Sequence, residues 1–143
     1  MDYHIYTDGA YSQQSGNGAW AYIILTDTRY INSDSGKSKY IKAPAIAEDI
    51  AIGMACYYLL SFCSLKENDN VFIYTDSLVT LEFVNESLDS RPRTNNKLVL
   101  DAVKNIKKVN ESCNLTISKV KAHKSKLSLN IVVDRFVKLA LRS

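Results

Sequence analysis

Cysteine is scarce in this sequence, which limits both the redox setting and the kinds of site it can build. There are three cysteines in 143 residues, an odd number without a Cys-x-x-Cys spacing. This pattern argues against a disulfide framework and against a cysteine-based zinc site. Cys56 and Cys63 stand in an apolar run, where cysteine behaves as a small core residue. We therefore expect a reducing, intracellular location, with the cytoplasm as the simplest assignment.

Long hydrophobic runs, linkers and low-complexity segments are also missing. No apolar stretch approaches the roughly 20 residues that we expect of a membrane span. With two prolines and five glycines, there is no Pro- or Gly-rich linker, and no repeat of domain size is visible. The first residues read as a strand rather than as a signal peptide. The sequence thus predicts a single soluble domain over residues 1–143 with no membrane partner.

A strong charge of either sign is lacking as well. The formal net charge is +3, with an isoelectric point near 8.7. The lysines are nevertheless uneven, since one group surrounds His123 and another lies on a predicted helix: Lys119, Lys121, Lys124 and Lys126, then Lys104, Lys107 and Lys108. Basic clusters occur on nucleic-acid-binding surfaces and on ordinary solvated faces, and charge alone leaves both readings open.

Hydrophobic periodicity predicts five strands and four helices. Strands are expected over residues 1–7, 19–26, within 30–41, over 71–75 and over 115–120. Helices are expected over residues 45–65 after a proline, from 76 or 77 to about 86, over 95–110 and over 129–141. A turn at 9–18 makes the first two strands an antiparallel hairpin, and residues 32–36 look like a turn or bulge. This order predicts an α/β fold with a five-stranded mixed sheet flanked by helices.

Two of the predicted strands end in the same four residues, Ile-Tyr-Thr-Asp. The first copy ends at Asp8 and the second at Asp76. A carboxylate at the end of a buried strand is costly unless it is paired or bound to a metal. Ligands of open α/β sheets bind beyond the carboxyl ends of the strands. If the two strands lie side by side, Asp8 and Asp76 become neighbours and form part of a divalent-metal site.

Two further acids stand in apolar helices, where a surface carboxylate is not expected. Glu48, followed by Asp49, lies near the start of the long helix, and Asp134 lies inside the last one. Hard divalent cations take oxygen ligands, and a pair of them can hydrolyse a phosphodiester. Four carboxylates suffice to hold such a pair. The alternative is a set of unrelated capping and solvated acids, with Glu48 and Asp49 compensating a helix dipole.

Several short segments of the sequence match the motifs of a known family. The sequence resembles a type-1 ribonuclease H in segments that follow the family's order and cover nearly the whole chain. They are YTDGA at 6–10, GAWA at 18–21, AEDIA at 47–51, IYTDS at 73–77, VKAH at 120–123 and NIVVD at 130–134. The predicted order of elements also fits the five-stranded mixed sheet of the ribonuclease H-like fold.

The resemblance implies roles for individual residues. Asp8, Glu48, Asp76 and Asp134 fall on the family's four catalytic carboxylates, which bind two Mg²⁺ ions, with Mn²⁺ as an alternative. Glu48 rather than Asp49 is the match, because Ala51 stands at the small position three residues after it. His123 falls on a loop histidine associated with proton transfer or product release. Asn95 resembles an asparagine that holds a DNA phosphate.

The sequence also departs from the family. In many members an asparagine pair before the glutamate reads the 2′-hydroxyls of RNA, whereas Pro44 and Ala45 stand here. A common glutamate near the last aspartate is replaced by Ile131, and the long basic insertion between the middle helices is missing. Its candidate replacements in nucleic-acid binding are Arg91, Arg93, Lys121 and Lys124. We expect binding that depends strongly on salt, helped by an attached or separate nucleic-acid-binding domain.

The sequence therefore predicts an endonuclease that cuts the RNA strand of an RNA/DNA hybrid and leaves 5′-phosphate and 3′-hydroxyl ends. A monomer is the expected state. One alternative is another nuclease of the same fold, such as a junction resolvase or a transposase-like enzyme. The other is a non-catalytic nucleic-acid-binding module. The sequence leaves open whether the enzyme is cellular or viral, and whether it is free-standing or a domain of a larger protein.

Overall fold

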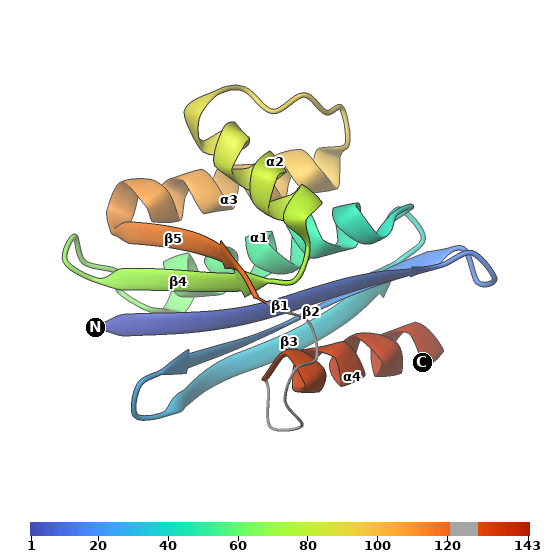
Figure 1. Cartoon of the computed structure of the whole chain (residues 1–143), viewed down its shortest axis with the longest axis horizontal. Coiled ribbons are helices and arrows are strands. Elements are labelled where there is room, and N and C mark those ends of the chain that lie inside the picture. The colour runs from blue at the N-terminus through green and yellow to red at the C-terminus, as the bar shows by residue number, and fades with distance from the viewer. Residues whose placement is uncertain (121–128) are drawn as a thin grey trace.

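The computed structural model describes residues 1–120 and 129–143 as nine elements around one sheet (Figure 1). The strands are β1 (Asp2–Ser12), β2 (Asn17–Thr26), β3 (Tyr30–Ser38), β4 (Asn70–Thr75) and β5 (Asn114–Lys119). The helices are α1 (Pro44–Phe62), α2 (Leu78–Asp89), α3 (Lys97–Ser112) and α4 (Leu129–Arg142). The predicted order of elements is confirmed.

The sheet is mixed, as the sequence predicts. Its strand order is β3-β2-β1-β4-β5. The first three strands form an antiparallel meander, while β4 pairs parallel with both β1 and β5. A parallel neighbour needs a crossover connection, and α1 supplies the one between the meander and β4. This topology makes β1 and β4, the twin strands of the sequence, adjacent in the middle of the sheet.

Helices cover both faces of the sheet. In Figure 1, α1, α2 and α3 lie on one side and α4 lies on the other. The main core fills the space under α1 and α3, and includes Ile5, Ile24, Ile52, Ile73 and Ile106. Successive strand side chains point to opposite faces, so the other set of β2 residues, Ala19, Ala21 and Ile23, packs against Val133 and Val137 of α4. Burial on both faces fixes the register of the central strands.

The predicted first strand and its turn have the wrong boundaries. The strand does not end at Thr7, because β1 continues to Ser12 opposite β2, which begins at Asn17. The polar, small residues after Thr7 look like a loop, but their backbone groups are paired with β2. The turn is limited to residues 13–16, where Gly16 adopts a φ of 74° that glycine adopts without steric cost.

The expected turn or bulge at residues 32–36 is also wrong. This segment lies within β3 and pairs continuously with β2. The irregularity falls earlier, where the partner of Ile24 is Asn32 and the partner of Leu25 is Tyr30. Pairing with the buried β2 strand outweighs the low strand propensity of the Asn, Asp, Ser and Gly residues, and the Tyr22 hydroxyl anchors the segment by donating to Asn32 Oδ1 at 2.7 Å.

Helix α1 is the core helix of the molecule. It begins at Pro44, as predicted, and ends at Phe62 rather than at residue 65. Contrary to the sequence-based expectation, it is long and apolar enough to span a membrane by length and composition, the one such helix in the described part of the chain. However, 56% of that window is buried, and α1 packs against β1, β2 and α3. Its apolar residues therefore build the core.

The N-terminus of α1 has no side-chain cap, which gives a stability prediction. Ala43 occupies the N-cap position with extended backbone angles, φ −156° and ψ 153°. A serine there can accept a hydrogen bond from an unpaired amide of the first turn. We expect Ala43→Ser to raise the free energy of unfolding by about 1 kcal/mol, measured by urea titration. Ala43→Val, which adds no acceptor, is the control and should bring no gain.

The predicted positions of the remaining helices are confirmed, although their ends differ by up to three residues from the prediction. Ser77 caps α2, accepting a hydrogen bond from the Thr80 amide at 3.1 Å. In α3 the cap is Asn96, whose Oδ1 accepts from the amides of Leu98 and Val99, so the helix starts at Lys97 and not at Asn95. Side-chain caps decide these boundaries more sharply than hydrophobic periodicity does.

Candidate active site

Three acids from β1, from α1 and from the connection after β4 converge at the point where the parallel part of the sheet ends. Pairing of β1 with β4 stops at Tyr6 and Tyr74, so Asp8 and Asp76 follow side by side. One carboxylate oxygen from each of Asp8, Glu48 and Asp76 lies within 4.8 Å of the others. Asp76 follows the last residue of β4, as expected. Asp8 does not end its strand, because β1 continues along β2.

Close packing at Gly9 brings Glu48 to the strands. A Cβ atom at Gly9 would overlap the backbone nitrogen of Glu48 and lie 2.6 Å from the carbonyl carbon of Ala47. Helix α1 therefore touches the β1 backbone directly beside Asp8. The glycine after the aspartate is required by this close approach, a role that the sequence did not reveal because a turn was expected there.

Two threonines hold Glu48 in place. Thr7 Oγ1 and Thr75 Oγ1 donate hydrogen bonds to the same atom, Glu48 Oε1, at 2.5 and 2.9 Å. All three side chains are buried. Thr7 and Thr75 each directly precede an aspartate of the cluster, so the twin strands contribute both the threonines that hold Glu48 and the acids beside it. Both threonines were missed as site residues, although the repeated Thr-Asp pair was the available signal.

The acids are electrostatically strained without a cation. Burial, the nearby carboxylates of Glu48 and Asp76 and a hydrogen bond with Asp134 raise the pKa of Asp8, although the Gly9 amide donates to its Oδ1 at 2.9 Å and lowers it. Burial also raises the pKa of Glu48 to about 7, against the opposing effect of the two threonine hydrogen bonds. Burial and like charge both favour the neutral acid. A positive charge in the cluster would instead favour the ionised carboxylates and lower these pKa values.

Asp49 is a second buried acid beside the cluster. It is 6% exposed, and its Oδ1 has no hydrogen-bond partner among the described residues. Burial and the charge of Glu48 raise its pKa to about 7. Both Glu48 and Asp49 lie beyond the first turn of α1, which contains no acid. Compensation of the helix dipole, the alternative reading of these acids, acts mainly within that first turn.

Asp134 reaches the cluster from the other face of the sheet. It lies on α4, and its side chain hydrogen-bonds to Asp8. It is not one of the three acids whose oxygens lie within 4.8 Å of each other. Its Oδ2 is 2.8 Å from Lys138 Nζ, one helical turn further along. The structure thus brings together the four acids that the sequence singled out, and adds a lysine that it did not.

The donor set suits a hard divalent cation. The three converging groups are all carboxylates, without cysteine or histidine from the described part of the chain. Mg²⁺ and Mn²⁺ prefer oxygen ligands, whereas zinc sites use mainly Cys and His. None of the salt bridges between described residues reaches Asp8, Glu48 or Asp76. The residues therefore fit a magnesium-type site in which the metal supplies the missing positive charge.

In the absence of metal, we expect the protein to lose stability as the pH rises from 5 to 8. The folded-state pKa values of Asp8, Glu48 and Asp49 lie above those of an unfolded chain, near 4. Between these values the folded state binds more protons, so the free energy of unfolding falls as pH rises. With chelator, the thermal midpoint measured by circular dichroism should drop by roughly 5 °C.

Two controls test whether these acids cause the effect. Saturating Mg²⁺ should abolish the fall in thermal midpoint, because the metal binds the ionised carboxylates. Asp8→Asn should reduce it, because one titrating group is removed. A midpoint that rises steadily from pH 5 to 8 with chelator present would contradict the prediction.

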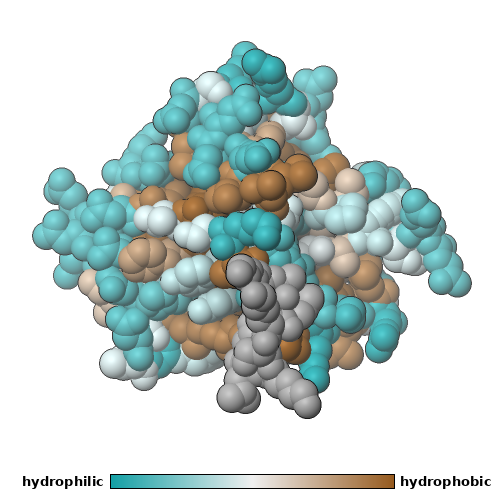
Figure 2. Space-filling model, viewed as in Figure 1, coloured by the Kyte–Doolittle hydropathy of each residue, from teal (hydrophilic) through white to brown (hydrophobic). Residues whose placement is uncertain are grey.

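The rim of the site is partly apolar. Directly after Asp76 and the Ser77 cap, Leu78 and Val79 are 51% and 65% exposed at the start of α2. Figure 2 shows apolar atoms along the middle of this face, below the hydrophilic atoms at the top of the view. The segment that follows Asp76 therefore presents apolar side chains to solvent beside the carboxylates.

The predicted nucleic-acid contacts that the structure describes are not part of the acidic cluster. Asn95 is exposed just before the Asn96 cap of α3. Arg91 and Arg93 belong to the loop between α2 and α3, at the top of Figure 1, and line a cavity of about 140 Å³. Three further predicted residues lie outside the described residues: Lys121, His123 and Lys124.

Comparison with known families identifies this arrangement. A family model described as RNase H matches residues 1–142. The chain belongs to the RNase H family. The family consists of divalent-metal-dependent nucleases that act on RNA/DNA hybrids, and the acidic cluster agrees with this membership. A search of curated proteins finds no match.

Solved structures share the RNase H fold at low sequence identity, and three are informative. RNase H1 from the halophilic archaeon Halobacterium salinarum NRC-1 has a TM-score of 0.69 and 18% identity, covering 99% of this chain and 98% of that one. The N-terminal RNase H domain of Rv2228c from Mycobacterium tuberculosis, a fusion with maltose-binding protein, gives 0.69 and 13%, covering 99% and 94%. The protease-reverse transcriptase of prototype foamy virus gives 0.69 and 19%, covering 96% of this chain but 20% of that chain.

Proposed function

We propose that this RNase H family protein is an endonuclease that hydrolyses the RNA strand of RNA/DNA hybrids and leaves 5′-phosphate and 3′-hydroxyl ends. The observation that carries the proposal is the convergence of Asp8, Glu48 and Asp76 within 4.8 Å in a chain that the RNase H model matches almost throughout. Asp134, hydrogen-bonded to Asp8, completes the set of acids.

The chain's own residues prepare the site for this reaction. Thr7 and Thr75 orient Glu48, the Gly9 amide orients Asp8, and the missing side chain at Gly9 lets α1 approach the strands. Two Mg²⁺ ions, when bound, would supply activation of the attacking water and stabilisation of the leaving 3′-oxygen. The carboxylates would hold the positive charges of the bound ions at fixed positions before substrate arrives. Little reorganisation of the site would then be needed during the reaction.

In many family members an asparagine pair selects RNA over DNA by contacting the 2′-hydroxyls, and this chain lacks that pair. Pro44 and Ala45, which occupy those positions, are the first residues of α1 and carry no side-chain hydrogen-bonding group. A backbone amide is the remaining kind of donor at a helix N-terminus. We propose that discrimination by the 2′-hydroxyl relies on backbone groups at this end of α1, and that it is weaker than in members with the asparagine pair.

The setting of the enzyme is also a proposal. The three cysteines are free, which suits a reducing, intracellular location such as the cytoplasm. We propose a monomer whose hybrid affinity rests on Arg91, Arg93, Asn95 and the lysines near His123. An attached or separate nucleic-acid-binding domain would strengthen this binding, since few phosphate contacts give weak, salt-sensitive affinity.

One cleavage experiment tests the function. A single labelled strand is presented in RNA/DNA hybrid, duplex RNA, duplex DNA and single-stranded RNA, each with Mg²⁺, with Mn²⁺ and with chelator. We expect metal-dependent cleavage of the RNA strand in the hybrid alone. Cleavage of duplex or branched DNA instead would identify another nuclease of this fold. The absence of metal binding and of cleavage would indicate a non-catalytic binding module.

A further inference from the structure

A lysine side chain is bound to one of the four acids of the site. Lys138 Nζ lies 2.8 Å from Asp134 Oδ2, a distance typical of a charge-assisted hydrogen bond. Among the salt bridges between described residues, this is the one that reaches any of the four acids. Asp134 also contacts Asp8, so the ammonium group stands at the edge of the acidic cluster.

The position of Lys138 allows it to leave Asp134 at little cost. The two residues are spaced i, i+4 on α4, and the lysine side chain is 60% exposed while the Asp134 side chain is 24% exposed. Lysine–carboxylate pairs with this spacing on a helix surface contribute only a few tenths of a kcal/mol to stability when the lysine is solvated, as Lys138 is. If another position for the ammonium group exists nearby, its free energy is therefore close to that of the pair with Asp134.

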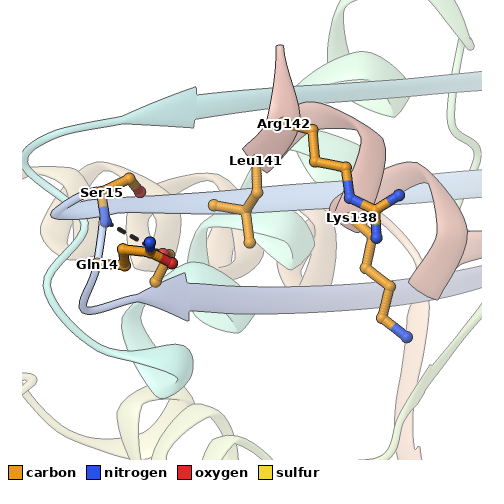
Figure 3. A pocket seen from close by; sticks show the side chains of 6 residues that line it. Gln14, Ser15, Lys138, Leu141 and Arg142 are labelled. Carbon is orange, nitrogen blue, oxygen red and sulfur yellow. Dashed lines mark hydrogen bonds between the residues drawn. The ribbon is translucent and has the colours of Figure 1, made fainter.

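That position is a groove that Lys138 itself helps to line. Lys138 and Arg142 lie next to each other on α4, across from Gln14 and Ser15 of the turn that joins β1 and β2 (Figure 3). The groove has a volume of about 500 Å³ and is also lined by Ser12 and Leu141. The Ser15 amide donates to Ser12 Oγ at 3.2 Å, which stabilises the turn on the opposite wall. Lys138 can therefore turn from Asp134 into an open groove whose opposite wall carries Ser12, Gln14 and Ser15.

We propose that Lys138 is a built-in competitor of the divalent metal at Asp134: its ammonium group occupies the carboxylate until a metal ion displaces it into the groove. The proposal rests on the proposed function in taking Asp134 as a metal ligand. A lysine and a divalent cation cannot approach the same carboxylate oxygen closely, because their charges repel. Lys138 then acts as a positioning residue that sets the metal concentration at which the site fills.

Metal binding by calorimetry tests this proposal without measuring cleavage. Mg²⁺ and Mn²⁺ are titrated into wild type, Lys138→Met and Lys138→Arg. The methionine removes the charge but keeps a similar length, whereas the arginine restores it. Removing one positive charge near a divalent ion should lower the metal dissociation constant about three- to tenfold, and less at high salt. Lys138→Arg should return the constant to near the wild-type value.

Lys97→Met is the matched control. Among the described residues, Lys97 forms a second i, i+4 lysine–aspartate pair, 3.9 Å from Asp101 on α3, and neither residue belongs to the acidic cluster. Lys97→Met removes a helix-surface pair and one positive charge, as Lys138→Met does. Because this pair lies outside the cluster, Lys97→Met should leave the metal dissociation constant unchanged. Thermal unfolding with chelator shows that each variant is folded before titration.

The possible outcomes separate this inference from the proposed function. An unchanged or higher metal dissociation constant in Lys138→Met, or an equal decrease in Lys97→Met, overturns the role of Lys138. If the wild type still cleaves hybrid in that case, the proposed function stands. Tighter metal binding in Lys138→Met without hybrid cleavage by the wild type supports the role of Lys138 and counts against the proposed function. A wild type that binds no divalent metal overturns the role of Lys138.

Discussion

Asp76→Asn is expected to lower the rate of hybrid cleavage on the order of 10³-fold while leaving the fold nearly unchanged. Asp76 contributes one of three carboxylate oxygens that converge within 4.8 Å. The amide keeps the size and one oxygen of the side chain but removes a negative charge. A hard divalent cation is held mainly by such charges, so both metal affinity and catalysis should fall together.

The measurement is single-turnover cleavage of a labelled hybrid with Mg²⁺, beside calorimetry with the metal alone. Asp89→Asn is the matched control, because Asp89 is an exposed acid at the end of α2 and outside the cluster. It undergoes the same chemical change and should cleave hybrid as the wild type does. Wild-type cleavage by Asp76→Asn would refute the assigned active site. A thermal midpoint far below the wild-type value would instead mark Asp76 as a structural residue.

Gly9→Ala is expected to lower the free energy of unfolding by about 3 kcal/mol and to weaken metal binding at the same time. The added methyl group would meet the Glu48 backbone nitrogen and the Ala47 carbonyl carbon. These are backbone atoms of α1, which cannot rotate away as a side-chain tip can. The helix must therefore shift away from β1, and this moves Glu48 away from Asp8.

Urea titration and metal calorimetry together check this prediction. Gly16→Ala is the comparison, since a Cβ atom there would meet nothing within 4 Å and only the positive φ is strained. That strain should cost about 1 kcal/mol and leave metal affinity unchanged. Equal losses of stability in the two variants, or normal metal binding by Gly9→Ala, would show that close packing at Gly9 does not position the site.

The sequence predicted the acids of this site better than the local structure around them. A carboxylate is conspicuous in an apolar strand or helix, so Asp8, Glu48, Asp76 and Asp134 could be selected without coordinates. Gly9 was not recognised, because its role depends on how closely another helix approaches. Lys138 was also missed, since nothing in the sequence distinguishes a lysine that pairs with an active-site acid from a solvated one.

The sequence by itself determined the element types, their order and the mixed sheet, because hydrophobic periodicity and helix signals are local properties of the chain. It also determined the family, since the motifs keep their order. Only the tertiary structure decided that residues 9–12 and 32–36 are strand, because pairing with β2 satisfies backbone groups that a polar sequence would otherwise expose to water.

The tertiary structure likewise decided which partners act on the acids. Thr7 and Thr75 share one oxygen of Glu48, and Lys138 holds Asp134, through contacts that depend on the packing of α1 and α4 on opposite faces of the sheet. Burial between these layers then raises the carboxylate pKa values. Desolvation depends on everything that surrounds a group in space, which the order of residues along the chain does not specify.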